Sequence, residues 1–236
     1  MDGRRLTGIA AISLAVGFNL PYAALAVIYD YPGVLRRPPG EALELFLAGG
    51  AWLVLVWEGF MLAALAMVPL AVALAVTPER LSVRPALAVA AALSGALAGL
   101  AQAIGLSRWV FVVPELARDH AEPTTRMASE QAFALLNAWG GVAIGEHLGQ
   151  LLTSLFVLQV AMMQRQERSG ITAAAGGLTA ALVLAGCFEG LALALGQSGA
   201  VFSLATTSGF LMLTVWLITT GVGLMQGPSA VKTREG

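Results

Sequence analysis

A glutamate and a histidine lie side by side in an apolar stretch of the chain. Glu146 and His147 belong to residues 140–163, a run long and apolar enough to be a membrane-spanning helix. Ionisable side chains in such a helix are costly unless they meet partners inside the protein, so they mark a candidate functional site. A carboxylate beside an imidazole could bind a cation, exchange a proton, or serve as acid and base.

Glycines recur at every fourth position in the same run. Gly141, Gly145 and Gly149 share one face of a helix and leave it without side chains. A bare stripe of this kind lets the backbone of another helix approach closely. The stripe therefore predicts helix packing rather than a ligand groove.

Two further acids, Glu58 and Glu189, also fall inside predicted spans. Counting 1.5 Å per residue from the helix ends puts both near the depth of Glu146, in the outer part of the bilayer. Asn19 and Arg108 could reach this level from other helices. The candidate ligand-binding residues are Glu58, Glu146, His147, Glu189, Arg108 and Asn19.

Three acids at one level would repel one another, so at least one should be protonated or neutralised. Arg108 is the nearest basic candidate by topology, and a bound cation is the alternative. Simpler interpretations stay open. Glu58 could face the lipid headgroups beside Trp57, and His147 could hydrogen-bond a backbone carbonyl and do nothing else.

Composition identifies an integral membrane protein. The 236 residues are 58% hydrophobic and 11% charged, whereas a soluble domain carries about 25% charge. The net charge of −1 leaves no basic face for a nucleic acid. No Cys/His pattern has metal-site spacing, so we assign no metal ligands, and no motif identifies a cofactor or catalytic residues.

The hydropathy pattern predicts an all-α bundle that forms one domain over residues 1–236, with a polar outer segment at 107–135. Six transmembrane helices are expected, at residues 6–28, 50–76, 86–105, 140–163, 171–195 and 201–224. A signal peptide is a weaker interpretation of the first run, since that run exceeds the usual apolar core of about 7–15 residues.

The distribution of Lys and Arg predicts both termini in the cytoplasm. Eight of the 13 basic residues then lie inside: Arg4, Arg5, Arg80, Arg84, Arg165, Arg168, Lys232 and Arg234. Most aromatic residues with polar tips would fall at or near the outer interface, as an aromatic belt: Tyr22, Tyr29, Tyr31, Trp52, Trp57, Trp109 and Trp139.

Three short motifs resemble a family of membrane proteins. They are Tyr31-Pro32-Gly33-Val34-Leu35, the segment from Gly105-Leu106-Ser107-Arg108-Trp109 to Pro114-Glu115-Leu116-Ala117, and Gly145-Glu146-His147-Leu148-Gly149. Together they are similar to the DUF4386 type, a bacterial integral membrane family of unknown function. The resemblance covers the first helix through the sixth. It implies a multi-pass protein of the bacterial inner membrane and supplies no reaction, cofactor or catalytic residue.

Three functions remain open at this point. The first is a binding protein that takes a small ligand, a cation or a proton in an acidic pocket in the outer half of the bundle. The second is a structural or regulatory membrane protein whose intramembrane glutamates are held in ion pairs. The third is a metal- or haem-dependent intramembrane enzyme. The expected partners are the lipid bilayer and a small-molecule or cation ligand, and homo-oligomer formation stays open.

Overall fold

The computed structural model describes residues 3–167 and 169–226. This part of the chain is helical throughout its length apart from short connections, and it contains no strand. The helices are α1 (Gly3–Ile28), η1 (Gly33–Arg36), α2 (Pro39–Ala75), α3 (Pro78–Val83), α4 (Pro85–Phe111), α5 (Val113–Ala121), α6 (Arg126–Leu136), η2 (Asn137–Leu148), α7 (Gly149–Gln166), α8 (Gly170–Gly186), α9 (Phe188–Ala194) and α10 (Ala200–Gln226).

Six stretches among the described residues are long and apolar enough to cross a membrane, which confirms the predicted helix bundle. They are Gly3–Ile28, Pro39–Ala75, Pro85–Ala121, Arg126–Gln166, Gly170–Ala194 and Ala200–Gln226. The second, third and fourth are longer than the sequence predicted. Residues 107–135, expected as a polar segment outside the spans, form the end of α4, then α5 and α6.

The second helix begins eleven residues before the expected start. A proline stands at its beginning, and a glycine bends it further along. Pro39 stands at the first helical positions, where its missing N–H costs nothing. Gly50 then breaks the helical path with φ 59° and ψ −157°, a conformation that glycine adopts without steric penalty. The residues after the kink therefore form the apolar helix that was expected, and the residues before the kink form an additional, shorter helix.

The fourth helix contains a wide segment. Residues Asn137–Leu148 form a π-helix, η2, between the α-helices α6 and α7. Its hydrogen bonds run from residue i to i+5, so each turn holds more residues than an α-helical turn. π-helical segments are rare and frequently occur at functional sites. Hydropathy predicted a helix here, but it could not predict this change of hydrogen-bond register.

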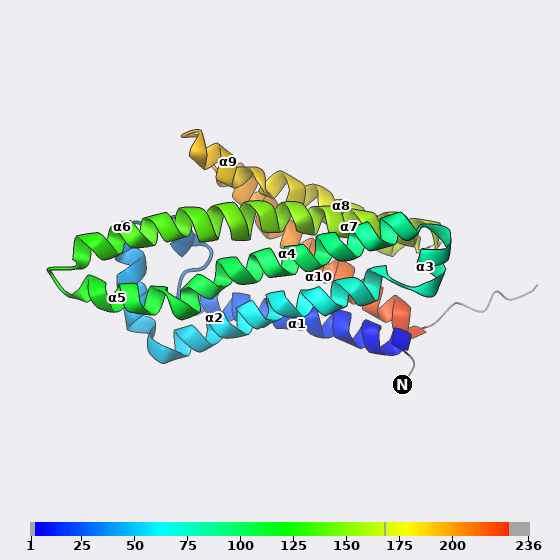
Figure 1. The fold of residues 1–236 in the computed structure, drawn as a ribbon, viewed down its shortest axis with the longest axis horizontal. Helices are drawn as coiled ribbons and strands as arrows, with labels where there is room; N and C mark the ends of the chain where they lie inside the picture. Colours follow the sequence, from blue (N-terminus) through cyan, green and yellow to red (C-terminus); the bar gives the residue numbers. More distant parts are fainter. Residues whose placement is uncertain (1–2, 168, 227–236) are drawn as a thin grey trace, which may run out of the picture.

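The helices pack as an elongated bundle (Figure 1). α4 packs against α2 and α7, α8 packs against α7 and α10, and α1 packs against α2 and α10. The hairpin of α5 and α6 extends at one end, and α3 lies at the other (Figure 1). α1 begins and α10 ends at the α3 end, where a Cβ on Gly8 would lie 2.6 Å from the carbonyl oxygen of Gly221.

The described residues form two large buried clusters and a third, small one of Met61, Ala64 and Ala103. The first, which we call the aliphatic core, consists mainly of alanine, leucine, methionine and valine from α1, α2, α4, α7 and α10, with Phe156 and Trp216. The second, the aromatic core, is built around Tyr29, Trp57 and Trp109. The two indole rings are stacked with centroids 4.8 Å apart and planes 9° apart.

Three residues expected in the aromatic belt are therefore buried inside the bundle instead. Trp57 and Trp109 are fully buried, whereas Trp52 and Trp139 are 65% and 67% exposed. Tyr29 is also buried and donates a hydrogen bond from its hydroxyl to the carbonyl of Ala42, at 2.9 Å. The buried rings stack on one another inside the bundle, so their polar edges do not reach an interface.

Candidate functional site

A cavity of about 250 Å³ lies next to the aromatic core. Its walls come from α1, η1, α2, α4, η2, α7, α9 and α10, so nearly every long helix contributes. The apolar part of the wall is largely aromatic: Phe18, Tyr22, Tyr31, Trp57, Phe60, Trp109 and Phe210. A cavity walled by rings can hold the apolar body of a small molecule.

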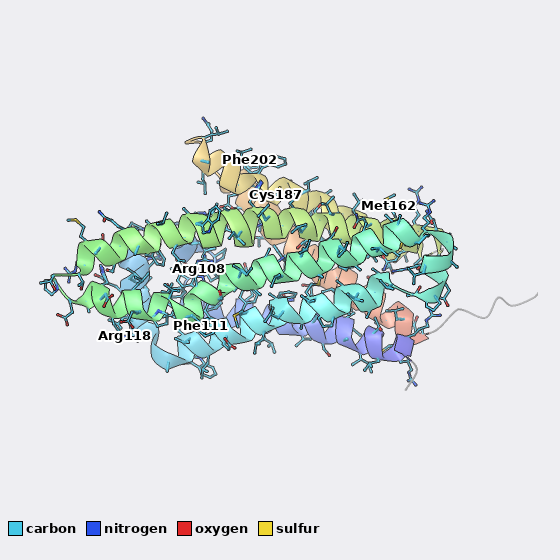
Figure 2. The ribbon with its side chains drawn as sticks, viewed as in Figure 1. Arg108, Phe111, Arg118, Met162, Cys187 and Phe202 are labelled. Carbon is cyan, nitrogen blue, oxygen red and sulfur yellow. The ribbon has the colours of Figure 1, made fainter. Side chains whose placement is uncertain are left out.

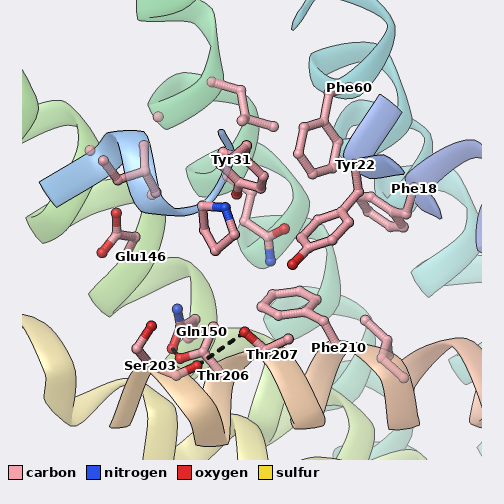
Figure 3. Close-up of a pocket in the computed structure, with 18 of the residues that line it drawn as sticks. Phe18, Tyr22, Tyr31, Phe60, Glu146, Gln150, Ser203, Thr206, Thr207 and Phe210 are labelled. Atoms are coloured by element: carbon pink, nitrogen blue, oxygen red, sulfur yellow. Dashed lines mark hydrogen bonds between the residues drawn. The ribbon is translucent and has the colours of Figure 1, made fainter. Parts of the chain in front are cut away.

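Polar side chains line the opposite side of the cavity. Gln150 of α7 faces Ser203, Thr206 and Thr207 of α10, while Phe18, Tyr22, Tyr31 and Phe60 gather across from them (Figure 3). Thr206 donates a hydrogen bond to Oε1 of Gln150 at 3.4 Å. These groups could bind the polar part of a ligand by hydrogen bonds.

Asn19, one of the predicted site residues, lies in the same wall. Its side-chain amide donates to the backbone carbonyl of Ala15 at 2.7 Å and to the hydroxyl of Thr214 at 2.8 Å. The first bond stays within α1, and the second joins α1 to α10. The amide oxygen remains as an acceptor for a ligand.

One arginine joins the two glutamates that the sequence placed at a common depth. Nη2 of Arg36 lies 2.5 Å from Oε2 of Glu146 and 3.0 Å from Oε1 of Glu189. Nε of Arg36 also donates to Oε1 of Glu189 at 3.1 Å. We call these three residues the Arg36 bridge. It connects η1 to η2 and α9, and all three residues line the cavity.

Arg36 reaches both glutamates because the connection between α1 and α2 folds back on the bundle. Val34 is buried there, and the side-chain amide of Asn137 donates to the carbonyl of Leu35 at 3.3 Å. Burial by itself lowers the pKa of the Arg36 guanidinium, but the charges and hydrogen bonds of Glu146 and Glu189 raise that pKa above its ordinary value. Arg36 therefore stays charged.

Arg108, which was expected to neutralise one of the glutamates, forms no ion pair within the described residues. It is 6% exposed and lies inside the bundle (Figure 2). Nη1 donates to the carbonyl of Gly105, and Nη2 donates to Oδ1 of Asn137 at 3.1 Å. Its guanidinium carbon lies 5.0 Å from the centroid of the Trp109 ring. The prediction was wrong about which arginine pairs with the glutamates. It rested on depth along the helices, whereas the connection between α1 and α2 folds back and brings Arg36 to them.

Two predicted site residues do not join the described cavity wall. Nδ1 of His147 lies 2.7 Å from the backbone carbonyl oxygen of Cys187 and therefore donates to it. That carbonyl lies at the break between α8 and α9, so His147 supports the joint (Figure 2). Glu58 follows the buried Trp57 and is half-buried as a residue, although its Oε2 is buried and has no donor among the described residues.

The glycine stripe faces α4. A Cβ on Gly141 would lie 2.6 Å from Nη2 of Arg108, one on Gly145 would lie 3.1 Å from Cα of Gly105, and one on Gly149 would lie 2.9 Å from the side chain of Gln102. The bare face thus allows η2 and α4 to approach. This contact brings Glu146 and Arg108 to the same cavity.

The walls carry no net formal charge. Arg36, Arg108, Glu146 and Glu189 are two cations and two anions among the described lining residues, so the expected acidic pocket is not seen. No group of three or more His, Cys, Asp or Glu residues in the described part of the chain could hold a metal ion. The arrangement suits a ligand that combines an apolar body with a polar or charged group.

Fold and composition together define a multi-pass membrane protein with six membrane-spanning helices. A family model described as "Domain of unknown function (DUF4386)" matches residues 6–221, and the chain belongs to this family. Comparisons with curated proteins and with solved structures gave no match.

Proposed function

We propose that this protein binds a small, mainly apolar molecule in the cavity between the aromatic core and α10. The observation that carries the proposal is the make-up of the wall: rings on one side, hydroxyl and amide groups on the other, and charged side chains beside them. Small-molecule sites have this composition, and their volumes begin near about 300 Å³. The cavity of about 250 Å³ fits a ligand of modest size.

The expected cation is not the ligand that this wall favours. Both glutamates that could attract a cation are already bound by Arg36. A structural role is the second candidate function, because the Arg36 bridge joins three elements without any ligand. The two functions differ in a measurable way, since only a binding site should be blocked when the cavity is filled.

Tryptophan fluorescence in lipid nanodiscs can test binding. Trp57 and Trp109 line the cavity, and replacing the exposed Trp52 and Trp139 by phenylalanine removes much of the background. The probe is 3-phenylpropan-1-ol, which has an apolar ring and a hydroxyl. We expect a saturable change in fluorescence. The same titration is made with 3-phenylpropanoate and 3-phenylpropylamine, and no saturable change with any of the three would contradict the proposal.

A matched pair of variants places the site. Thr207 lines the cavity and uses its hydroxyl only within α10, so Thr207→Phe should fill the space and abolish saturable binding. Thr219 lies on the same helix, does not belong to the described wall and also bonds within α10, so Thr219→Phe should bind like the parent. Equal binding by both variants would assign the signal to another site and favour the structural role.

We further propose that both termini face the cytoplasm of a bacterial inner membrane. The distribution of Lys and Arg supports this orientation. Reporter fusions after Arg84 should be cytoplasmic, and fusions near Pro39 and Pro123 should be external. A cytoplasmic signal at Pro39 would reverse the orientation and leave the cavity proposal untouched.

A further inference from the structure

Arg108 differs from the other arginines near the cavity in the kind of partner that it has. Arg36 contacts two carboxylates, and the neighbouring Arg37 contacts Asp30 and Glu41. The partners of Arg108 in the described structure are a backbone carbonyl, an amide oxygen and an indole ring, and all of these are neutral. A buried cation without an anion is strongly unfavourable, since neutral groups replace its hydration only in part.

The hydrogen-bonding capacity of Arg108 is also not filled. Its Nε is buried and has no acceptor among the described residues. The indole N–H groups of Trp57 and Trp109, which line the same cavity, are likewise buried without an acceptor. Two buried acceptor oxygens also lack a described donor, Oε2 of Glu58 and Oε1 of Gln159, but neither residue lines the described cavity. Three N–H groups of the wall around Arg108 are thus without an acceptor among the described residues.

The anions nearest in the wall do not remove this imbalance. Glu146 acts on Arg108 electrostatically but lies beyond ion-pair distance, and its carboxylate is held by Arg36. An anionic ligand would bring a negative charge and further acceptor oxygens to Arg108, which has no carboxylate partner among the described residues. Guanidinium groups bind carboxylates through paired, charge-assisted hydrogen bonds.

We propose that the ligand is a small amphipathic anion whose carboxylate or similar acidic group binds Arg108 and whose apolar body lies against the aromatic wall. This inference rests on the proposed binding function and names the chemical class of its ligand. Phe18, Tyr22 and Phe60 form the surface for the apolar body. Arg36 holds Glu146 and Glu189 and so limits their repulsion of the anion.

Three probes with the same phenylpropyl body test the charge directly: 3-phenylpropanoate, 3-phenylpropan-1-ol and 3-phenylpropylamine. Titrations use the tryptophan signal in nanodiscs, and nanodiscs with Thr207→Phe measure partition into lipid. We expect the parent to bind the carboxylate about tenfold more tightly than the alcohol. We expect the amine to bind most weakly.

Two variants separate ligand recognition from stability. Arg108→Gln should abolish the preference for the carboxylate over the alcohol, whereas Arg108→Lys keeps the charge and should retain part of it. Glu146→Gln offers an independent measurement if Arg108→Gln does not fold. Removing this negative charge should tighten binding of the carboxylate, but it should weaken binding of the amine if the ligand is a cation.

The outcomes distinguish this inference from the function on which it rests. Equal affinity for the three probes, or preference for the amine, would overturn the anion inference and leave a binding cavity. Weaker carboxylate binding by Glu146→Gln would also overturn it. No saturable binding of any probe would overturn the proposed function itself.

Discussion

The half of the bundle near α3 and the half near η1 are held together by different contacts. In the first, small residues bring backbones together: a Cβ on Gly99 would lie 2.7 Å from the carbonyl oxygen of Ala64, and one on Gly221 would lie 2.5 Å from that of Gly8. In the second, large rings and charged groups meet around a cavity. Stacked rings and the Arg36 bridge add there to the close backbone contact between Gly105 of α4 and Gly145 of η2.

The difference concerns where in a membrane helix bundle a binding site can lie. Lipid tails are as apolar as leucine, so helices in a bilayer associate through packing and hydrogen bonds rather than burial of apolar surface. The half near α3 satisfies this largely by close backbone contact, and the groove of about 460 Å³ between α1 and α2 there has no charged side chain in its lining. The other half leaves a cavity and holds two arginines and two glutamates in its wall, and the proposed binding function rests on this arrangement.

The largest expected effect comes from adding a side chain where two backbones touch. Gly221→Leu places a side chain against the carbonyl of Gly8 and should force α1 and α10 apart. We expect a loss of about 1–3 kcal/mol in the free energy of unfolding, as for other overpacked interiors. Thermal unfolding in detergent micelles measures it.

Gly223 supplies the control for this prediction on the same helix. It is exposed, and a Cβ there would meet no atom within 4 Å. Gly223→Leu should therefore unfold like the parent. If the two variants lose stability equally, close backbone contact does not hold this half together.

A smaller loss is expected when the Arg36 bridge is broken. Arg36→Met leaves Glu146 and Glu189 without their shared cation, although the side chain of Arg36 is already 31% exposed. Hydrogen bonds to charged groups contribute about 1.5–3 kcal/mol, and solvent screening places the expected loss in the lower part of this range. Arg36→Lys should recover only part of it, because one ammonium cannot replace a planar fork.

Arg37→Met is the matched control, since this neighbouring arginine pairs with the exposed Asp30 and Glu41. Its effect should be within about 1 kcal/mol. The measurement is again thermal unfolding in micelles. Equal losses for Arg36→Met and Arg37→Met would show that the bridge behaves as an ordinary surface ion pair.

Sequence alone could predict the spans and the side of η2 that meets α4. Apolar runs determine which stretches can cross, and the four-residue spacing of Gly141, Gly145 and Gly149 marks a face for close approach. Depth counting also placed Glu146 and Glu189 at one level, and the structure brings them to one guanidinium. These features depend on distance along a helix axis, which the chain order records.

The direction in which a side chain points across the bundle was harder to predict than its depth. Glu58 was expected at the same depth as the other two acids. At that point of α2, however, the neighbouring Trp57 is the residue that is fully buried and lines the cavity. Arg36 lies in a connection whose folded path depends on contacts made far away in the chain, including the one from Asn137. The sequence signal for this connection was its prolines, Pro32, Pro38 and Pro39, which restrict the backbone of residues 31–39 and make a short connection stiff. Trp109 was expected at the membrane interface, but in the structure its ring is stacked on Trp57.

The smallest expected effect concerns an ion pair at the opposite end. Arg80 of α3 lies 2.6 Å from Glu167, which follows α7, and the Glu167 side chain is 43% exposed. Glu167→Gln removes the charge and keeps a hydrogen-bonding side chain. We expect a loss below about 1 kcal/mol, because the carboxylate is partly exposed and screened by water and ions, although the Arg80 side chain is only 10% exposed. Raising the salt concentration should reduce the difference in stability between Glu167→Gln and the parent. The larger loss from Arg36→Met should change less with salt, since the side chains of Glu146 and Glu189 are only 20% and 10% exposed. Equal salt sensitivity at the two ends would show that water reaches the cavity half as freely as the surface, and the contrast between the halves would then be one of packing alone.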